Sequence, residues 1–274
     1  MQACIIGRAI SLAGALLFFL SGAAGAQEPV GLYSATTIIT GTLDEEKRRG
    51  FAACLLEVLV KVSGDPDLSA SPKMTALAAT AEGFVEAYTL RDRMAGIPVH
   101  DEQGTRERPH LLNATFSKAK IDGALRTLGR SPWLNRPTIT ILVGIDNGAR
   151  HFVVSRDSPV GVDQREALSE IAARFGLKIA VPDEAALAAV PIDFAAVDAA
   201  DRRRLDVLRR ALGGTVLLSG ALVWNEEALR WTSHWHLVSG ENAGTWVSSG
   251  VSFDEVFRDA LANAMRSLGP GGDR

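Results

Sequence analysis

The sequence predicts an α+β protein in two halves: a ferredoxin-like split β-α-β half, then a second α/β half that ends in a three-stranded antiparallel meander and a C-terminal helix. Up to residue 145, the patterns follow the order strand, helix, strand, strand, helix, strand. Three strand-like segments then come in succession before the last helical pattern. We expect the first half to span residues 27–147 and the second to span residues 161–269, with a tail at 270–274.

The composition is that of an ordinary globular protein. Of the 274 residues, 47% are apolar and 22% are charged, which is enough apolar material for a sizeable core. The 29 Lys and Arg residues nearly balance the 32 Asp and Glu residues, and no run of like charges is longer than Arg202-Arg203-Arg204. We therefore expect neither a nucleic acid nor an anionic membrane surface as partner.

The first 26 residues have the pattern of a cleavable Sec-type signal peptide. One cation, Arg8, precedes an apolar run at 9–20, and small residues follow at 21–26. We expect cleavage between Ala26 and Gln27 and release of the mature chain into the periplasm. The alternative, an uncleaved membrane anchor, needs about 20 consecutive apolar residues, and this run is shorter. No later segment is apolar enough to span a bilayer, so we expect no membrane span after cleavage.

In the first half, residues 30–40 are rich in β-branched side chains and predict a strand. A capping box formed by Thr42 and Glu45 then opens a long amphipathic helix, which Gly64 ends. The further elements expected in this half are a short helix at 73–81, strands at 84–92 and 111–117 joined by a hairpin loop at 96–109, a helix from Ile121 to Leu128 and a strand at 138–145. Because the last strand is apolar at nearly every position, we expect it to be covered on both faces.

A linker at 156–161 is expected to lead into the second half. The elements expected there are helices at 165–175, after Pro182 and at 201–212, a short strand at 177–181, strands at 215–224, 229–238 and 244–251, and a last helix that starts at a capping box of Ser252 and Glu255. The middle strand of the meander alternates between a buried and a solvated face. The buried face is expected to carry Leu229, Trp231, Trp235 and Leu237, and the solvated face Arg230, Thr232, His234 and His236.

Motifs for nucleotide binding and acyl transfer are missing from the sequence. Gly213-Gly214-Thr215 lacks the spaced glycines and the lysine of a phosphate-binding loop, and Ser219-Gly220 lies inside an expected strand instead of at a nucleophile elbow. We therefore expect no cofactor and no catalytic residue. Cys54, the one cysteine beyond the signal peptide, lies on the apolar side of a helix, which favours a buried structural role over a reactive thiol.

The clearest metal-binding alternative is His234-x-His236, because side chains at i and i+2 on a strand point to the same face. A catalytic zinc ion needs a third ligand with its own supporting contacts. The other histidines, His100, His110 and His151, lie in unrelated segments. We therefore interpret the pair as solvent-facing positions of the strand, and we expect no metal.

Four residues are candidates for interaction with a partner: Trp133, Arg136, His234 and His236. Arg136 stands next to Pro137 and enters a strand expected to be buried, so its guanidinium must find a carboxylate or a backbone carbonyl. We expect an ion pair with Asp65 or Asp67. The tryptophans are interpreted as packing between sheet and helix, and the alternative is a stacking surface for a sugar or a peptide.

Several motifs carry a family resemblance. They are residues 33–41, Arg48-Arg49-Gly50-Phe51, residues 58–66, Trp133-x-x-Arg136-Pro137 and the Trp-rich strands from Gly220 to Trp246. Together they resemble the bacterial exported-protein family catalogued as domain of unknown function 2066. That resemblance implies a proteobacterial exported protein without an assigned activity and without catalytic residues to carry over. The second half is also similar to the small N-terminal α/β domain of TolB-type envelope proteins, which implies an interaction role.

We therefore expect a non-catalytic periplasmic binding or adaptor protein that meets an envelope protein or a cell-wall component through an exposed sheet face or edge. The signal peptide, the two α/β halves and the missing catalytic motifs favour this function. The alternative is a metal-dependent hydrolase that acts on cell-wall or peptide material with His234 and His236 at its site.

Overall fold

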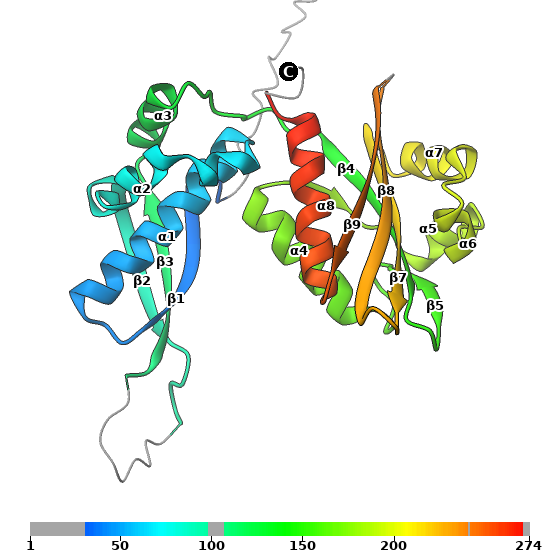
Figure 1. Cartoon of the computed structure of the whole chain (residues 1–274), viewed down its shortest axis with the longest axis horizontal. Coiled ribbons are helices and arrows are strands. Elements are labelled where there is room, and N and C mark those ends of the chain that lie inside the picture. The colour runs from blue at the N-terminus through cyan, green and yellow to red at the C-terminus, as the bar shows by residue number, and fades with distance from the viewer. Residues whose placement is uncertain (1–30, 98–106, 241, 271–274) are drawn as a thin grey trace, which may run out of the picture.

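The computed structural model describes residues 31–97, 107–240 and 242–270. In these ranges the chain is α+β, with two β-sheets and helices packed against them (Figure 1). The strands are β1 (Ser34–Thr40), β2 (Val85–Asp92), β3 (Pro109–Phe116), β4 (Thr138–Asp146), β5 (His151–Val153), β6 (Lys178–Ala180), β7 (Val216–Asn225), β8 (Arg230–Ser239) and β9 (Asn242–Gly250). The helices are α1 (Asp44–Ser63), α2 (Pro72–Ala78), α3 (Lys118–Thr127), α4 (Val162–Phe175), α5 (Glu184–Ala189), α6 (Phe194–Asp198), α7 (Arg202–Ala211) and α8 (Phe253–Leu268), with short 3-10 helices η1 (Pro66–Ala70) and η2 (Ala81–Phe84).

Some sequence predictions fall outside the described residues. These are the signal peptide at 1–26 with its cleavage site between Ala26 and Gln27, the residue His100, and most of the tail, 271–274. Within the described ranges, no helix combines the length and the apolarity that crossing a bilayer requires.

The first sheet is antiparallel, in the order β1-β3-β2, and α1 packs on one of its faces. Ile39 of β1 and Leu112 of β3 are buried under this helix. Gly50 allows the close approach of α1, because a Cβ atom there would lie 2.4 Å from Leu112 Cδ2 and 2.7 Å from Ile39 Cγ2. Among the described residues, β1 and β2 each have a strand partner on one side only, so both are edge strands.

The start of α1 corrects one sequence prediction. Its N-cap is Leu43, which makes no side-chain capping hydrogen bond, so the predicted capping box of Thr42 and Glu45 does not form. The acidic residues at 44–46 lie in the first turn, where they stabilise the positive end of the helix dipole. The C-terminal end is as predicted: Gly64 has a φ of 70° and donates its backbone N–H to the carbonyl of Val60 at 3.0 Å.

The second sheet has the order β5-β4-β7-β8-β9, with β6 paired to β4. β4 runs parallel to β6 and β7, whereas β7, β8 and β9 form the antiparallel meander that the sequence predicted. Figure 1 shows α4 and α8 on one side of this sheet and α5, α6 and α7 on the other. Helix α8 begins at the predicted N-cap, where the backbone N–H of Glu255 donates to Ser252 Oγ at 3.3 Å.

The ferredoxin-like sheet predicted for the first half is not confirmed, because its fourth strand lies elsewhere. The order β1-β3-β2 is the one that the first three strands of such a sheet take, and the fourth strand would lie beside β1. Instead β4, the strand predicted at 138–145, lies in the second sheet between β5 and β7. The reason is burial: residues 139–145 are all buried, and of the two described sheets it is the second that has helices on both faces.

The change from the first sheet to the second therefore falls between α3 and β4, at residues 128–137. The segment 156–161, predicted as the linker between halves, lies after β4 and is packed within the second half. Arg165 of α4 donates hydrogen bonds to the backbone carbonyls of Ser155 and Ser158, at 3.0 and 2.9 Å. These bonds hold the segment against α4, whereas a flexible linker would make no such contacts.

The middle strand of the meander, β8, alternates largely as predicted. Trp235 and Leu237 are buried, and His234 is exposed on the other face. Leu229 is a correction, because it lies in the turn before β8 with a φ of 48° and is 66% exposed. The turn conformation turns this side chain away from the buried face.

Candidate functional site

Arg136 joins the two halves through backbone carbonyls. It lies between α3 and β4 and is 6% exposed. Its Nε donates to the carbonyl of Trp133 at 2.8 Å, and its Nη1 donates to the carbonyls of Phe175 and Gly176 at 3.0 and 3.2 Å. Its Nη2 donates to the carbonyl of Lys61. Because α1 and α4 both end at these carbonyls, the negative ends of two helix dipoles face one cation.

The ion pair predicted between Arg136 and Asp65 or Asp67 is therefore wrong, and the carbonyl alternative is confirmed. Asp65 instead accepts from Arg130 Nε at 2.7 Å, and Asp67 pairs with Arg266. Burial lowers the pKa of Arg136 to about 10, so the guanidinium remains a cation at neutral pH.

Trp133 belongs to the same junction. Its backbone N–H donates to the carbonyl of Val62 at 2.7 Å, and its ring lies 4.4 Å from Cζ of Arg136. The ring also occupies the space beside Gly64, where a Cβ atom would lie 2.4 Å from Trp133 Cε3. Trp133 and Arg136 are thus both buried between the halves, and neither is presented on the surface to a partner.

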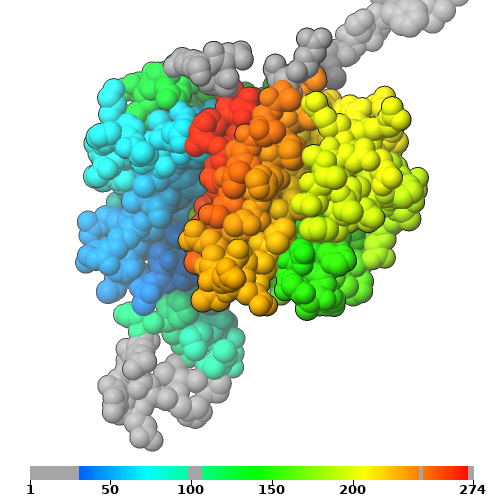
Figure 2. Space-filling view, turned by 45° about the vertical axis from the view of Figure 1, so that its right-hand side comes forward, coloured from blue at the N-terminus to red at the C-terminus, as the bar shows by residue number. Residues whose placement is uncertain are grey.

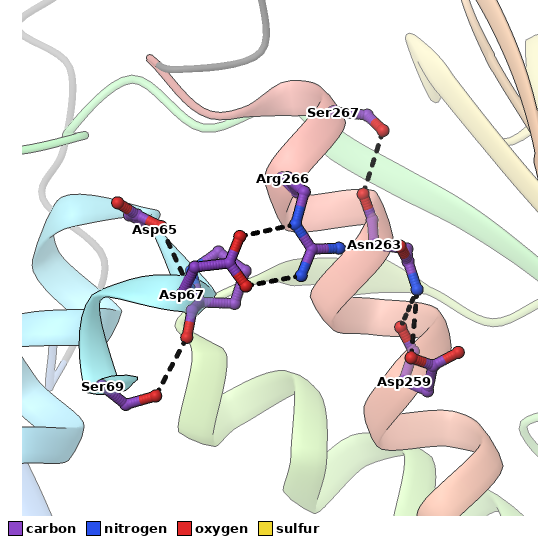
Figure 3. A network of polar contacts seen from close by, with 8 residues as sticks. Asp65, Asp67, Ser69, Asp259, Asn263, Arg266 and Ser267 are labelled. Carbon is purple, nitrogen blue, oxygen red and sulfur yellow. Dashed lines mark hydrogen bonds and ion pairs between the residues drawn. The ribbon is translucent and has the colours of Figure 1, made fainter. Parts of the chain in front are cut away.

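Two ion pairs reach across the halves beside this junction. Asp67 of η1 and Arg266 of α8 form a two-bond pair, with both N···O distances at 2.8 Å (Figure 3). Arg266 also donates to Asn263 Oδ1 at 2.7 Å, which orients the guanidinium toward η1. The second pair joins Glu57 of α1 to Arg174 of α4 at 3.1 Å. In the first pair, the two hydrogen bonds from Arg266 hold the pKa of the Asp67 carboxyl below its usual range.

A groove of about 520 Å³ lies between the halves, which we call the interhalf groove. It is lined by α1, η1, α4 and α8 and by Thr36 and Thr37 of β1. Its apolar lining includes Leu56 and Val60 of α1 and Phe175 of α4. Figure 2 shows the N-terminal half, in blue and cyan, meeting α8, in red, along a narrow seam.

Among the described residues that line the interhalf groove, one arginine has no ion-pair partner. Arg174 and Arg266 are paired with carboxylates, but Arg258 of α8 is exposed and forms no ion pair with any residue of the described ranges. An anionic group that entered the groove would find this guanidinium available.

The edge of β1 borders the interhalf groove with unpaired backbone groups. Tyr33 accepts from the backbone N–H of Phe116, which sets the alternation of the β1–β3 ladder. The N–H and C=O groups of Thr36, Ile38 and Thr40 therefore point away from β3. No other strand of the described residues pairs with them. A further hollow of about 650 Å³, lined by Ile38 and Ala173, continues along this edge toward α4.

Two ionisable groups in α1 have pKa values shifted by burial. Lys61 is 6% exposed, its Nζ donates to the carbonyl of Ser34 at 2.8 Å, and burial lowers its pKa. Cys54 is buried, as predicted, and burial raises the pKa of its thiol to about 12. The thiol therefore stays protonated at neutral pH, which is unsuited to a nucleophile.

None of the described residues supplies a third ligand for His234 and His236. The two side chains share one face of β8, with His234 exposed and His236 half-buried. In the part of the chain that the structure describes, no three His, Cys, Asp or Glu residues gather as a metal-binding group. His110 and His151 lie on β3 and β5, away from β8.

The sequence pattern did not reveal the interhalf groove. It identified the strand at 30–40, but a strand's edge position depends on which strands pair with it, and this pairing is a tertiary property. Arg174 and Arg258 look like ordinary surface positions of amphipathic helices in the sequence. Only the packing of α1, α4 and α8 shows that both arginines line one groove.

Comparison with protein-family models matches residues 26–134 to a domain of unknown function, DUF8605. The family expected from the motifs, domain of unknown function 2066, is a different one, so that expectation is wrong, and no family match supports the likeness of the second half to TolB-type domains. No curated protein and no solved structure matches the chain. The matched segment contains β1, α1 and η1, which line one side of the interhalf groove, and it ends before β4.

Proposed function

We propose that the chain is a non-catalytic binding or adaptor protein of the cell envelope that captures an extended segment of a partner protein as an added strand beside β1. One observation carries the proposal: among the described residues β1 is an edge strand, and its outward backbone groups lie next to the interhalf groove. Folded proteins usually cover or block such edges, because an open edge pairs readily with another chain. Partner segments use main-chain hydrogen bonds for affinity and side-chain pockets for specificity.

The added strand takes the place that the fourth strand has in a ferredoxin-like sheet. In this chain that strand, β4, belongs to the second sheet, so the position beside β1 is open among the described residues. A partner strand there would complete a four-stranded sheet with the ferredoxin-like order. Binding would therefore give the outward backbone groups of β1 hydrogen-bond partners.

The lining of the interhalf groove defines the chemistry of the partner segment. Outward groups at Thr36, Ile38 and Thr40 recur every two residues, about 7 Å apart, which is the repeat of an extended chain. Leu56 and Phe175 offer an apolar surface, and Arg258 offers a cation that forms no ion pair with a described residue. The partner segment thus carries an apolar side chain and an acidic side chain on the same face.

Export to the periplasm is the second part of the proposal. It is supported by the order of one cation, an apolar run and small residues in 1–26. The family match begins at residue 26, where the expected signal peptide ends. An envelope partner follows from this location.

Photo-crosslinking in cells tests the proposal. A benzophenone amino acid placed at Ile38, which is 52% exposed, should yield an adduct with one envelope protein. The same group at Leu229, at the tip of the β7–β8 turn, is the control and should not yield that adduct. Equal adducts from both positions, or none from Ile38, would contradict the proposal.

A backbone substitution separates strand addition from simple surface contact. Ile38→Pro removes an outward N–H while leaving the β1–β3 ladder intact, because that N–H does not bond to β3. Ile38→Ala removes the side chain and keeps the N–H. We expect the adduct formed from a benzophenone at Thr36 to be lost in Ile38→Pro and retained in Ile38→Ala.

The alternative of a metal-dependent hydrolase has no observation in its favour among the described residues, since His234 and His236 gain no third ligand there.

A further inference from the structure

A second hollow, unrelated to β1, lies on the other side of the second sheet. It measures about 760 Å³ and is formed by α7 and the facing surface of β7, β8 and β9. We call it the α7 hollow. Four arginines of α7 line it: Arg202, Arg203, Arg209 and Arg210. A hollow of this size accommodates a small molecule.

The α7 hollow has an excess of positive charge. Asp206 accepts from Arg209 at 2.8 and 2.6 Å and from Arg210 at 3.0 Å, so one carboxylate serves two guanidinium groups. Arg202 and Arg203 are exposed and form no ion pair with any described residue. This net positive charge favours a bound anion.

A buried hydroxyl in the α7 hollow is an independent observation. Ser219 of β7 is 1% exposed, and its Oγ has no hydrogen-bond partner among the described residues. It lies opposite His236 in the β7–β8 ladder, so both side chains are on the face that lines the hollow. A buried hydroxyl without a hydrogen-bond partner costs free energy, and a ligand that accepts a hydrogen bond from it would remove that cost.

We propose that the α7 hollow binds the phosphate group of a small amphiphilic molecule. Arg202 and Arg203 supply two guanidinium groups that no described carboxylate pairs. Two such groups suit a phosphate monoester, which carries nearly two negative charges at neutral pH, better than they suit a single carboxylate. The hydroxyl of Ser219 donates a hydrogen bond to a phosphate oxygen. Leu217 and Val238, which also line the hollow and share the face of Ser219 and His236, contact the apolar part of the ligand.

Two sources supply this chemistry: a soluble phosphomonoester and the headgroup of a phospholipid. Calorimetric titration of the full chain uses inorganic phosphate and octyl phosphate as probes. We expect octyl phosphate to bind with one site per chain and about tenfold more tightly than inorganic phosphate, because of the apolar walls. Sedimentation with vesicles of phosphatidic acid, and not of phosphatidylcholine, would assign the lipid source. Binding of octyl phosphate without vesicle binding would assign the soluble source.

Matched variants locate the site. Arg202→Gln should weaken octyl phosphate binding at least about fivefold. Arg204→Gln, which removes the same charge from α7 but at a residue paired with Asp201 and outside the hollow, should not. Ser219→Ala should weaken binding, whereas Ser233→Ala, which removes another buried unpaired hydroxyl outside the hollow, should leave it unchanged.

Two outcomes would overturn the proposal. Absence of saturable heat with either probe up to about 10 mM would exclude the site. Equal weakening by Arg202→Gln and Arg204→Gln would show that net charge alone attracts the probe. Circular dichroism and the melting temperature of each variant confirm that a loss of binding does not come from unfolding.

Discussion

The guanidinium of Arg136 donates a hydrogen bond to the backbone carbonyl of Lys61, 75 residues earlier in the chain. The same guanidinium binds the carbonyls at the end of α4, so one side chain fixes the C-terminal ends of two helices from the two halves. Those helices line the interhalf groove. The shape of the groove therefore depends on a residue that does not line it.

We expect Arg136→Met to lower the free energy of unfolding by about 3 kcal/mol, because several buried carbonyls lose their donor. The free energy of unfolding of Arg136→Lys should lie between those of Arg136→Met and the wild type, since one ammonium group cannot donate to both helix ends. Arg130→Met is the control: it breaks the half-exposed pair with Asp65 and should cost less than about 1 kcal/mol. Urea unfolding measures all three, and equal losses in Arg136→Met and Arg130→Met would contradict a stabilising role of the hydrogen bonds from Arg136 to the helix-end carbonyls.

The pair of Asp67 and Arg266 makes stability depend on acidic pH. The pKa of Asp67 is lower in the folded chain than its ordinary value of 3.8, so the unfolded chain takes up this proton first as the pH falls. The stability that the pair contributes is fully present above pH 3.8 and is lost as the pH falls through the folded-state pKa of Asp67. Both side chains are partly exposed, so we expect about 0.5 kcal/mol. Asp67→Asn should remove the loss of stability in acid that comes from this pair, and urea unfolding curves recorded across the acidic pH range would show it.

Cys54 makes stability depend on alkaline pH in the opposite direction. Its pKa is raised from 9.0 to about 12 in the folded chain, so the unfolded chain loses the thiol proton first as the pH rises. Stability should therefore fall between these two values, and Cys54→Ala should show a smaller fall. An equal alkaline slope in wild type and variant would mean that the thiol is not protected.

The same burial predicts how Cys54 reacts. In a chain that begins at Gln27, where it is the one cysteine, Ellman's reagent should modify it slowly in buffer and completely in denaturant. Rapid modification in buffer would show that the α1 face opens toward the interhalf groove.

Gly50 and Gly123 are both helical glycines and should respond in opposite directions to alanine. At Gly50 the new methyl would overlap Leu112 and Ile39, so Gly50→Ala should destabilise by about 1 to 2 kcal/mol by pushing α1 from the sheet. At Gly123 the nearest atom is 3.8 Å away, and the alanine should stabilise by about 0.5 to 1 kcal/mol through helix propensity. Thermal unfolding distinguishes the two.

The local sequence was sufficient for most elements. The end of α1 at Gly64, the N-cap of α8 at Ser252 and the meander of three strands all appear where the patterns predicted them. The capping box at Thr42 failed, because the backbone there enters the helix one residue later and the side chain no longer faces the open N–H groups. Such errors are small, since they concern one turn.

The larger errors concern partners distant in the sequence. Arg136 was expected to pair with Asp65 or Asp67, because a buried guanidinium needs a hydrogen-bond acceptor. Helix-end carbonyls satisfied it instead, and no sequence pattern indicates which helix ends will converge. The basic face of α7 was likewise seen as one short run of like charge, and its meeting with Ser219 depends on the packing of α7 on β7.

The sequence by itself determined most of the helices and strands, which of their faces are apolar and that Cys54 is buried, because these properties depend on residues within a few positions of one another. The tertiary structure alone decided that β4 joins the second sheet, that β1 is left as an edge, and that Asp67 meets Arg266 across 199 residues. These outcomes depend on which buried surfaces cover each other best. That competition is settled over the whole chain, and the interhalf groove and the α7 hollow are its products.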